Sequence, residues 1–199
     1  MHRVTDVTLA VVAGGQGRRL SGTPKGLLKL QGRTVLERLL DLSPLFADVL
    51  LVANAPEPYS RFGLRTVADV VPGKGAPGGV HAALVAARTE WVLAVACDMP
   101  FVSPEAVRLL LEARSPDLDA LCFTVGGRVE PLLAVYRTAL SVSWGKALEH
   151  GDPSLREFLA SGRSRLLPEA ALRAVDPELR SLVNVNTPED LERHGLALP

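Results

Sequence analysis

The chain has 199 residues, 47% of them hydrophobic, and its formal net charge at pH 7 is zero. A chain of this length can bury a full core without disulfides, so we expect residues 1–199 to form a single domain. The balanced charge argues against a nucleic-acid partner and against binding to an anionic membrane surface. No apolar run approaches the ~18 residues of a transmembrane helix, and no signal-peptide cleavage pattern is present, so we expect a cytoplasmic protein.

Strand-like and helix-like segments alternate along the first part of the chain. The first apolar run, residues 7–13, is continuous, as in buried parallel strands. Ser103 and Pro104 form a typical helix start, because serine caps the first turn and proline fits the first helical position. In chain order, the expected elements are strand 7–13, helix 34–46, strand 48–54, strand 64–69, helix 78–88, strand 91–98 and helix 103–114.

The second part of the chain begins with two apolar runs, 119–125 and 129–136, which are separated by Gly126-Gly127. This dipeptide predicts a tight hairpin between antiparallel strands. The remaining expected elements are helix 139–150, helix 154–161, strand 181–185 and helix 187–195. The order of elements predicts a three-layer α/β sandwich whose sheet is mostly parallel, with the hairpin adding an antiparallel strand.

The residues that follow the first strand combine a flexible backbone with positive charge. Glycines let backbone amides approach an anion closely, and nearby cations can neutralise a triphosphate. The glycines are Gly14, Gly15 and Gly17, and the cations are Arg18, Arg19 and Lys25. Their spacing matches neither a P-loop nor a dinucleotide fingerprint. We therefore predict a nucleotide-triphosphate loop of another kind.

Three of the expected strands end in polar residues: Asn54, Asp69 and Asp98. The carboxyl ends of parallel strands meet at one edge of a sheet, where ligands bind, so we expect these residues near the glycine loop. Asp98 opposite bound phosphates would suit Mg²⁺, which typically uses one or two carboxylates plus substrate phosphates. Asp69 could bind a second metal or a nucleoside, or it could close a turn.

Glu130-Pro131 interrupts the otherwise apolar strand 129–136. Because proline donates no ladder hydrogen bond, the pair indicates either a bulged edge strand or a contact with a second substrate. No serine or cysteine is grouped with a histidine in the sequence, so no covalent nucleophile is evident. Cys97 and Cys122 lie in apolar runs and are expected to be reduced core residues.

Five segments of the chain resemble the motifs of one family, the molybdenum cofactor guanylyltransferases, or MobA family, within the nucleotidyltransferases. They are VAGGQGRRLSGTPKGLL (12–28), VADVVPGKGAPGGVHAAL (67–84), ACDMPFV (96–102), GRVEPLLAVY (127–136) and NVNTPEDL (184–191). The last two, together and in order, are the most specific. The resemblance implies a Rossmann-like α/β/α nucleotidyltransferase fold. It also implies transfer of GMP from GTP to molybdopterin, with or without molybdenum, and release of pyrophosphate.

The resemblance further implies roles for individual residues and partners. By position, Val12, Ala13, Gly14 and Gly15 would contact guanine and phosphates, Lys25 the triphosphate, Asn54 and Asp69 the nucleoside, Asp98 the nucleotide and Mg²⁺, and Asn184 and Asn186 molybdopterin. Lys25 and Arg19 would stabilise the leaving pyrophosphate. The three asparagines of the chain all fall at these positions. The expected partners are GTP, molybdopterin and proteins of cofactor biosynthesis.

The chain departs from the family pattern at Leu20-Ser21, where Met-Gly is usual, and at Pro24, where aspartate usually precedes the lysine. A Pro-Lys pair is common in sugar and cytidylyl nucleotidyltransferases. Transfer of CMP to molybdopterin, or of a nucleotidyl group to another small phosphate, therefore stays open. A nucleotide-binding module without catalysis is the third alternative. The cations of the loop together with Asp98 argue against it, because a simple binder needs no metal carboxylate.

Overall fold

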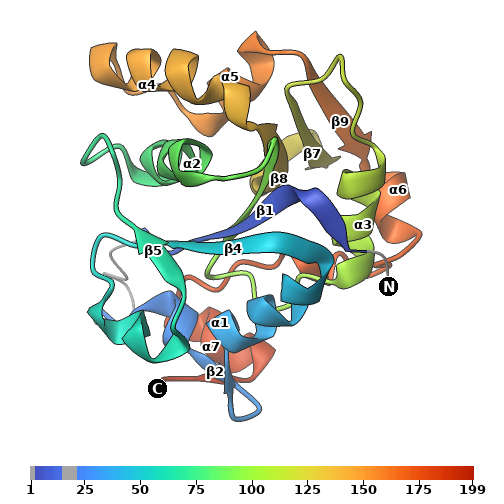
Figure 1. Ribbon diagram of the computed structural model, residues 1–199. Coiled ribbons are helices and arrows are strands. Elements are labelled where there is room, and N and C mark those ends of the chain that lie inside the picture. The colour runs from blue at the N-terminus through green and yellow to red at the C-terminus, as the bar shows by residue number, and fades with distance from the viewer. Residues whose placement is uncertain (1–2, 15–21) are drawn as a thin grey trace.

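A seven-stranded sheet forms the middle layer of the computed structural model, which describes residues 3–14 and 22–199 (Figure 1). Its strands are β1 (Val4–Val12), β4 (Phe46–Val52), β5 (Arg65–Val67), β6 (Trp91–Ala96), β7 (Ala120–Val125), β8 (Arg128–Arg137) and β9 (Ser164–Pro168). They lie in the order β5-β4-β1-β6-β8-β7-β9. β8 is antiparallel to β6 and β7, and the other neighbouring strands are parallel. The arrangement confirms the predicted mostly parallel sheet with an antiparallel hairpin strand.

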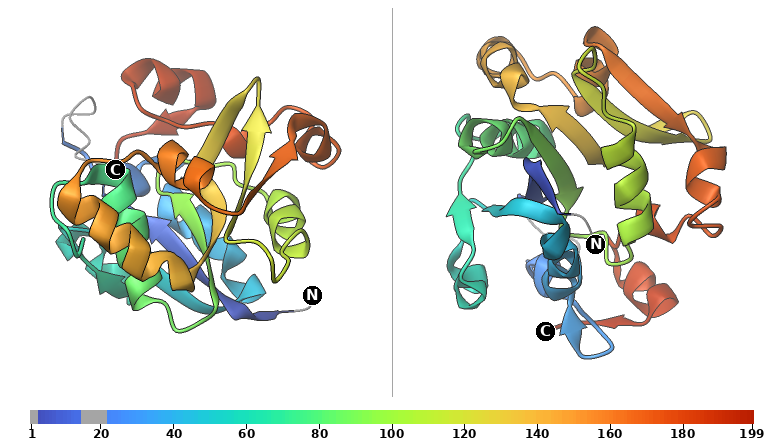
Figure 2. Two further views of the ribbon diagram at one scale, coloured as in Figure 1. Left: turned by 90° about the horizontal axis from the view of Figure 1, so that it is seen from above. Right: turned by 45° about the vertical axis from the view of Figure 1, so that its right-hand side comes forward.

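Helices cover both faces of this sheet and complete the predicted three layers (Figures 1 and 2). One face carries α2 (Gly75–Ala86), α4 (Ser141–His150) and α5 (Leu155–Ser161), and the other carries α1 (Val35–Leu39), α3 (Pro104–Glu112), α6 (Glu169–Arg173) and α7 (Pro188–His194). Short 3-10 turns are η2 (Lys25–Leu27), η3 (Leu40–Leu45), η4 (Glu57–Phe62), η5 (Thr138–Leu140) and η6 (Arg180–Leu182). None of the described helices has both the length and the hydropathy needed to cross a bilayer.

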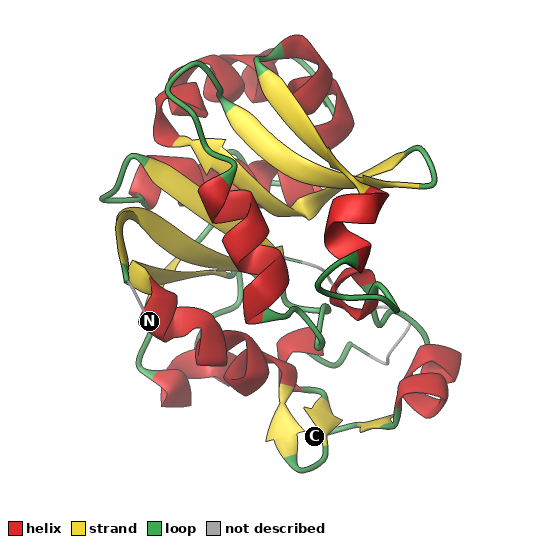
Figure 3. Ribbon diagram, turned by 90° about the vertical axis from the view of Figure 1, so that its right-hand side faces the viewer, coloured by secondary structure: helices red, strands yellow, loops and turns green. Residues whose placement is uncertain are grey.

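A small antiparallel sheet lies beside α7, away from α4 and α5 (Figures 1 and 3). Its strands are β10 (Leu196–Ala197), β2 (Lys29–Leu30) and β3 (Arg33–Thr34), in the order β10-β2-β3. Leu196 pairs with Leu30, so the end of the chain is held beside a segment from its beginning. Two-residue strands are too short to show a periodicity, and this sheet could not be predicted from the sequence.

The central strands distribute their side chains between two cores. Leu9 and Val11 of β1 belong to the cluster under α1 and α3, whereas Ala10 and Val12 belong to the cluster under α2. β6, which pairs with β1 in register, alternates in the same way. A strand that is buried on both faces is apolar at nearly every position, and this explains the long apolar runs in the sequence.

Helix α2 lies close to the sheet because glycine occupies its contact position. A Cβ added to Gly79 would lie 2.7 Å from Cγ1 of Val12 in β1. On its outer side, α2 is covered by α4 (Figure 2). There the ring of the buried His81 lies 3.1 Å from the Ser141 carbonyl, and burial lowers the pKa of this histidine below its ordinary 6.5. α2 is therefore fixed between β1 and α4.

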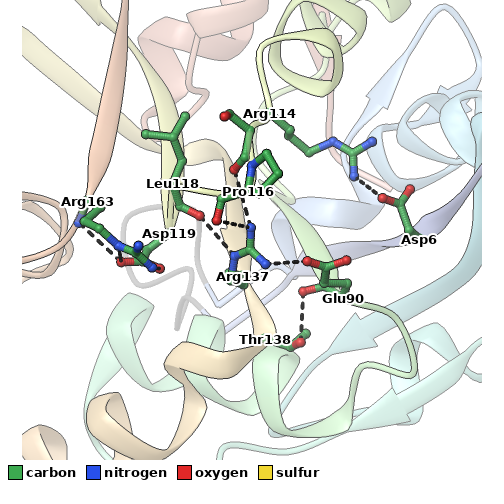
Figure 4. A network of polar contacts seen from close by, with 10 residues as sticks. Asp6, Glu90, Arg114, Pro116, Leu118, Asp119, Arg137, Thr138 and Arg163 are labelled. Carbon is green, nitrogen blue, oxygen red and sulfur yellow. Dashed lines mark hydrogen bonds and ion pairs between the residues drawn. The ribbon is translucent and has the colours of Figure 1, made fainter.

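A network of arginines lies at the end of the sheet where β6 begins and the antiparallel β8 ends (Figure 4). Arg137, at the end of β8, pairs with Glu90 and lies 4.4 Å from the centre of the Trp91 ring at the start of β6. Arg114 pairs with Asp6 of β1 at 2.8 Å. These contacts fix β1, β6 and β8 relative to one another at the end of the sheet opposite to the carboxyl ends of β1 and β6.

The local signals for turns and caps are confirmed. Gly126 and Gly127 have φ angles of 54° and 74°, which glycine adopts without strain, and they join β7 to β8. The Ser103 hydroxyl accepts a hydrogen bond from the Ala106 amide at 3.1 Å at the start of α3. Thr187 caps α7 in the same way. The predicted helix 34–46 is confirmed only in part, because α1 ends at Leu39 and continues as the 3-10 turn η3.

The predicted strand 181–185 is wrong. Its first residues belong to η6, in which the Arg180 and Ser181 amides donate to the buried Asp176 carboxylate at 3.0 and 2.7 Å. Because the carboxylate satisfies these donors, they do not join a strand ladder. The sequence analysis also missed β9 and α6, which follow α5 directly.

Replacing Gly79 with alanine should destabilise the fold by about 1–3 kcal/mol, because the new methyl group overlaps Val12 in a packed interior. Urea unfolding followed by circular dichroism measures the loss. Gly151→Ala is the matched control, because Gly151 has an extended backbone and an added Cβ there meets its nearest atoms at 3.8 and 4.0 Å. Equal stabilities of the two variants would contradict the close contact between α2 and β1.

Candidate active site

Three parallel strands end together at one edge of the sheet. Their hydrogen bonds continue just past the strand ends, from the Ala13 amide to the Val52 carbonyl at 2.8 Å and from the Cys97 amide to the Val12 carbonyl at 3.0 Å. The residues that follow, Asn54 and Asp98 among them, therefore leave the sheet at the same edge. The antiparallel β8 brings its first residues to this edge as well. This is the edge at which α/β sheets bind their ligands.

Lys25 and Asp98 form an ion pair at this edge. Lys25 Nζ lies 2.9 Å from Asp98 Oδ2, and each side chain is 16% exposed. The same ammonium donates to Asn186 Oδ1. The Asp98 carbonyl accepts a hydrogen bond from the Val185 amide at 2.9 Å, which holds the C-terminal segment against the end of β6. The structure thus brings together three of the residues that the sequence singled out.

The two oxygens of the Asp98 carboxylate differ in their partners, since Lys25 contacts only Oδ2. Asp98 Oδ1 is buried and has no hydrogen-bond partner among the described residues. A buried carboxylate oxygen without a donor is costly unless a cation or a donor reaches it. In the described part of the chain no three histidine, cysteine or acidic side chains gather as a metal cage. One carboxylate supplemented by substrate phosphates is the arrangement that Mg²⁺ commonly uses.

A cavity of about 160 Å³ lies beside this ion pair and is lined by residues that include Val12, Gly14, Lys25, Gly75 and Asp98. Helix α2 begins at the cavity, and no side chain caps its first turn. The free amides and the helix dipole at such an N-terminus favour an anion. The cavity therefore combines an ammonium and a helix N-terminus, which attract phosphates, with a carboxylate, which attracts a metal.

Cys97 lines the same cavity, but it is not poised as a nucleophile. Burial, together with the nearby charge of Asp98, raises the pKa of the Cys97 thiol to about 12. A cysteine reacts as its thiolate, so this side chain stays an unreactive thiol near neutral pH. Both cysteines of the chain are buried and free, as expected.

Asn54 and Asp69 hold each other at the ends of β4 and β5. Asn54 Nδ2 donates to Asp69 Oδ2, and the Asp69 amide donates to Asn54 Oδ1, each at 2.8 Å. Asp69 Oδ1 is buried without a partner in the described structure. The carboxylate also lies near Gly79 of α2, where an added Cβ would be 3.8 Å from Oδ1. The pair therefore fixes the start of the loop before α2. Asp69 Oδ1 can still accept a hydrogen bond from a ligand.

Glu130 lies in a bulge of an interior strand. β8 runs between β6 and β7, so the edge-strand interpretation of Glu130-Pro131 is wrong. The register shifts between the pairs Cys122–Ala134 and Phe123–Glu130, and this bulge accommodates a proline that cannot donate to the ladder.

The environment of Glu130 favours its protonated form. Burial raises the pKa of Glu130 above its ordinary 4.5, and the charge of Asp98 raises it further. Hydrogen bonds from the Leu132 amide and the Asn184 side chain oppose this shift. Glu130 and Asn184 therefore lie close together, within electrostatic reach of Asp98.

Four of the predicted site residues, Gly15, Gly17, Arg18 and Arg19, lie outside the described residues. Lys74, just before α2, donates to the Gly151 carbonyl at 2.9 Å and pairs with Asp152 at 2.6 Å. The sequence analysis missed the N-terminus of α2 as part of the site, because it placed the start of this helix at residue 78. The glycines of PGKGAPGG, residues 72–79, were the available signal.

A larger groove of about 630 Å³ lies along η3 and η6 and includes Phe101 and Arg180. Two of its charged groups, Arg180 and Asp176, already have partners within the protein. The Arg180 guanidinium lies 4.3 Å from the centre of the Phe101 ring, and the Asp176 carboxylate accepts the amides of η6. Despite its smaller volume, the cavity at Asp98 is the better candidate, because it contains Asp98 Oδ1, a buried acceptor that has no partner among the described residues.

Known proteins resemble this chain over nearly its full length. A family model described as the MobA-like NTP transferase domain matches residues 9–168. The molybdenum cofactor guanylyltransferase of Desulfosudis oleivorans is 32% identical, and the match covers 96% of both chains. A probable molybdenum cofactor guanylyltransferase of Chloroflexus aggregans is 40% identical, with 92% of this chain and 90% of that protein covered.

Solved structures show the same fold. The molybdopterin-guanine dinucleotide biosynthesis protein A of Archaeoglobus fulgidus superposes with a TM-score of 0.81 at 32% identity, covering 94% of this chain and 96% of that one. The Rv0371c protein of Mycobacterium tuberculosis, solved in complex with manganese, has a TM-score of 0.67 at 21% identity, with 95% and 97% covered. The second likeness concerns the fold alone.

The raised pKa of Glu130 predicts a pH dependence of stability. Above pH 4.5 the native state binds more protons at this group than the unfolded state does, so its contribution to the free energy of unfolding falls as pH rises. Glu130→Gln should therefore become more stable relative to the wild type between pH 4 and pH 7. Urea unfolding at several pH values measures this difference.

Glu157→Gln is the control with the opposite sign. Hydrogen bonds from Ser154 lower the pKa of Glu157, so its contribution is present above 4.5 and is lost as pH falls. The Glu157→Gln deficit should thus be larger at pH 7 than at pH 3. If the stability of Glu130→Gln stayed parallel to that of the wild type at every pH, the assignment of a raised pKa would be wrong.

Proposed function

The chain belongs to the MobA-like NTP transferase family, and we propose that it transfers GMP from GTP to molybdopterin. Membership confirms the resemblance seen in the sequence motifs and makes the protein a nucleotidyltransferase. In the proposed reaction, a phosphate oxygen of molybdopterin, with or without bound molybdenum, attacks the α-phosphorus of GTP. The bond between the α-phosphorus and the oxygen bridging to the β-phosphate breaks. Pyrophosphate leaves, and a guanine dinucleotide forms.

The observation that supports this proposal is the cavity at the carboxyl edge of the sheet. Lys25, the start of α2 and Asp98 meet within about 160 Å³. An ammonium and a helix N-terminus are suited to the phosphates of a nucleotide. A carboxylate at the same place would repel phosphates unless a cation stood between them. The three groups together therefore favour a metal-bound nucleoside triphosphate over a free anion.

The proposed chemistry depends on positioning and charge neutralisation. The attacking phosphate is already an anion at neutral pH, so no general base is needed. Lys25 would bind the triphosphate and, with Arg19 of the loop outside the described residues, would stabilise the leaving pyrophosphate. Two anions must approach each other in this reaction, and fixed cations lower the cost of that approach.

Asp98 is the residue that would hold the metal ion, for which we propose Mg²⁺. Its buried Oδ1 has no partner among the described residues, and oxygen is the ligand that Mg²⁺ prefers. When bound, the ion would neutralise charge on the phosphates. Asp98 is held for this task by the strand end that precedes it and by the Val185 amide.

The two substrates would contact different residues at the carboxyl edge of the sheet. Val12, Ala13, Gly14 and Gly15 are proposed to contact guanine and the phosphates, and Asn54 and Asp69 the nucleoside. Asn184, Asn186 and Glu130 are proposed to contact molybdopterin. We also propose that residues 1–199 act as one domain in the cytoplasm, together with proteins of cofactor biosynthesis. The two cores share the strands of one sheet, which supports the single-domain assignment.

Transfer of CMP is the alternative that a specific observation favours, because Pro24 precedes Lys25 where the family usually has aspartate. Incubation of the protein with molybdopterin, Mg²⁺ and either GTP or CTP tests both proposals. We expect pyrophosphate and a guanine dinucleotide from GTP. Preference for CTP would establish the alternative. Nucleotide binding without pyrophosphate release would indicate a binding module.

Asp98→Asn should lower turnover by at least about 100-fold, because the variant loses the carboxylate that balances the metal charge. Product formation is measured by chromatography, and circular dichroism verifies the fold. Asp119→Asn is the matched control. Asp119 pairs with Arg163 at a distance of 2.9 Å, and it does not line the cavity. Wild-type turnover in Asp98→Asn would exclude the proposed role of this carboxylate.

A further inference from the structure

Lys25 occupies one oxygen of the carboxylate that a metal ion needs, and its charge lies beside the other. Its Nζ lies 2.9 Å from Asp98 Oδ2 and also donates to Asn186 Oδ1. Both members of the ion pair are largely buried, with 16% of each side chain exposed. A pair shielded from water in this way attracts more strongly than a surface pair. The structure therefore holds a cation on Asp98 that belongs to the protein itself.

A divalent cation and this ammonium would compete for one acid. Asp98 is a single carboxylate, and no cluster of three metal-ligating side chains accompanies it in the described residues. Two cations that share one carboxylate at short range repel each other, and the repulsion is strongest where water is excluded. A metal ion without nucleotide therefore binds at Asp98 only against the charge of Lys25.

We propose that Lys25 is a placeholder cation whose transfer from Asp98 to the triphosphate opens the carboxylate to the divalent ion. The nucleotide attracts Lys25 away from Asp98 and supplies phosphate oxygens as further metal ligands. Metal and nucleotide then bind together, and the metal alone binds weakly. The proposal rests on the proposed function only in naming a triphosphate as the group that receives Lys25.

The movement can be confined to the side chain. The backbone around Lys25 is fixed, because the Leu27 amide bonds to the Pro24 carbonyl at 2.9 Å and the Leu28 amide to the Lys25 carbonyl at 3.1 Å. The next residue, Gly26, lies so close to the buried Tyr59 that an added Cβ would be 3.0 Å from its ring. Lysine suits such a transfer because its ammonium lies on a flexible stem with three rotatable donors.

Binding of Mn²⁺ alone, with no nucleotide present, tests the proposal directly. Lys25→Met should bind free Mn²⁺ roughly tenfold more tightly than the wild type, because the competing charge is gone. Electron paramagnetic resonance of unbound Mn²⁺ measures the affinity. Lys25→Arg keeps the charge and should stay weak. Lys74→Met is the matched control, because this lysine pairs with the exposed Asp152 and should leave Mn²⁺ affinity unchanged.

A second arm measures the coupling between metal and nucleotide. A non-hydrolysable GTP analogue should increase Mn²⁺ affinity more in the wild type than in Lys25→Met, because only the wild type must release its placeholder. Asp98→Asn added to Lys25→Met should abolish the gain in Mn²⁺ affinity. If the gain persisted in the double variant, Mn²⁺ would be bound elsewhere and the proposal would be wrong.

Equal affinity of the wild type and Lys25→Met for free Mn²⁺ would overturn the placeholder role. Thermal unfolding of each variant verifies that it folds, and Lys25→Gln gives an independent neutral replacement. The outcome is separate from that of the product assay. A chain that prefers CTP can still show the Mn²⁺ effect, and a guanylyltransferase can still lack it.

Discussion

The common end point of β1, β4 and β6 is the constraint on which the site depends. Parallel pairing in register means that the three strands leave the sheet at one level, and the Ala13 and Cys97 amides carry the pairing just beyond it. The last residues of each strand, 9–12 of β1, 50–52 of β4 and 91–96 of β6, are apolar and buried. The polar residues of the site therefore begin only where these strands end. Asp98 owes its position to this rule.

The antiparallel strand β8 begins at the edge of the sheet where β1, β4 and β6 end. Its carboxyl end lies with the arginine network around Trp91, and its first residues lie with Asp98. The bulge at Glu130 interrupts the pairing with β7 while the pairing of residues 133–137 with β6 is kept. An acidic side chain can thus be buried close to a second acid without loss of the sheet. Bulges commonly redirect side chains near active sites in this way.

The sequence predicts those elements of the fold that a single local pattern determines. Continuous apolar runs identify β1, β4 and β6, and Gly126-Gly127 identifies the hairpin. The run 181–185 also contains several apolar residues, but the Asp176 carboxylate binds the amide of its first residue, Ser181, and no apolar pattern reveals that acceptor. The same limit applies to the site. Asp98 and Lys25 can each be singled out from their motifs, whereas their contact joins residues 73 positions apart and depends on the whole sheet.

Residues near the C-terminus contact the candidate site residues that come earlier in the chain. Val185 bonds to the Asp98 carbonyl, Asn186 accepts from Lys25, and β10 pairs with β2 close behind them. Synthesis proceeds from the amino end, so a nascent chain can assemble β1, β4 and β6 long before these contacts exist. Contacts between residues so far apart in sequence also carry a larger loop-closure entropy than local contacts do. A nascent chain that has already formed β1, β4 and β6 therefore still lacks the contacts that Val185 and Asn186 make with Asp98 and Lys25.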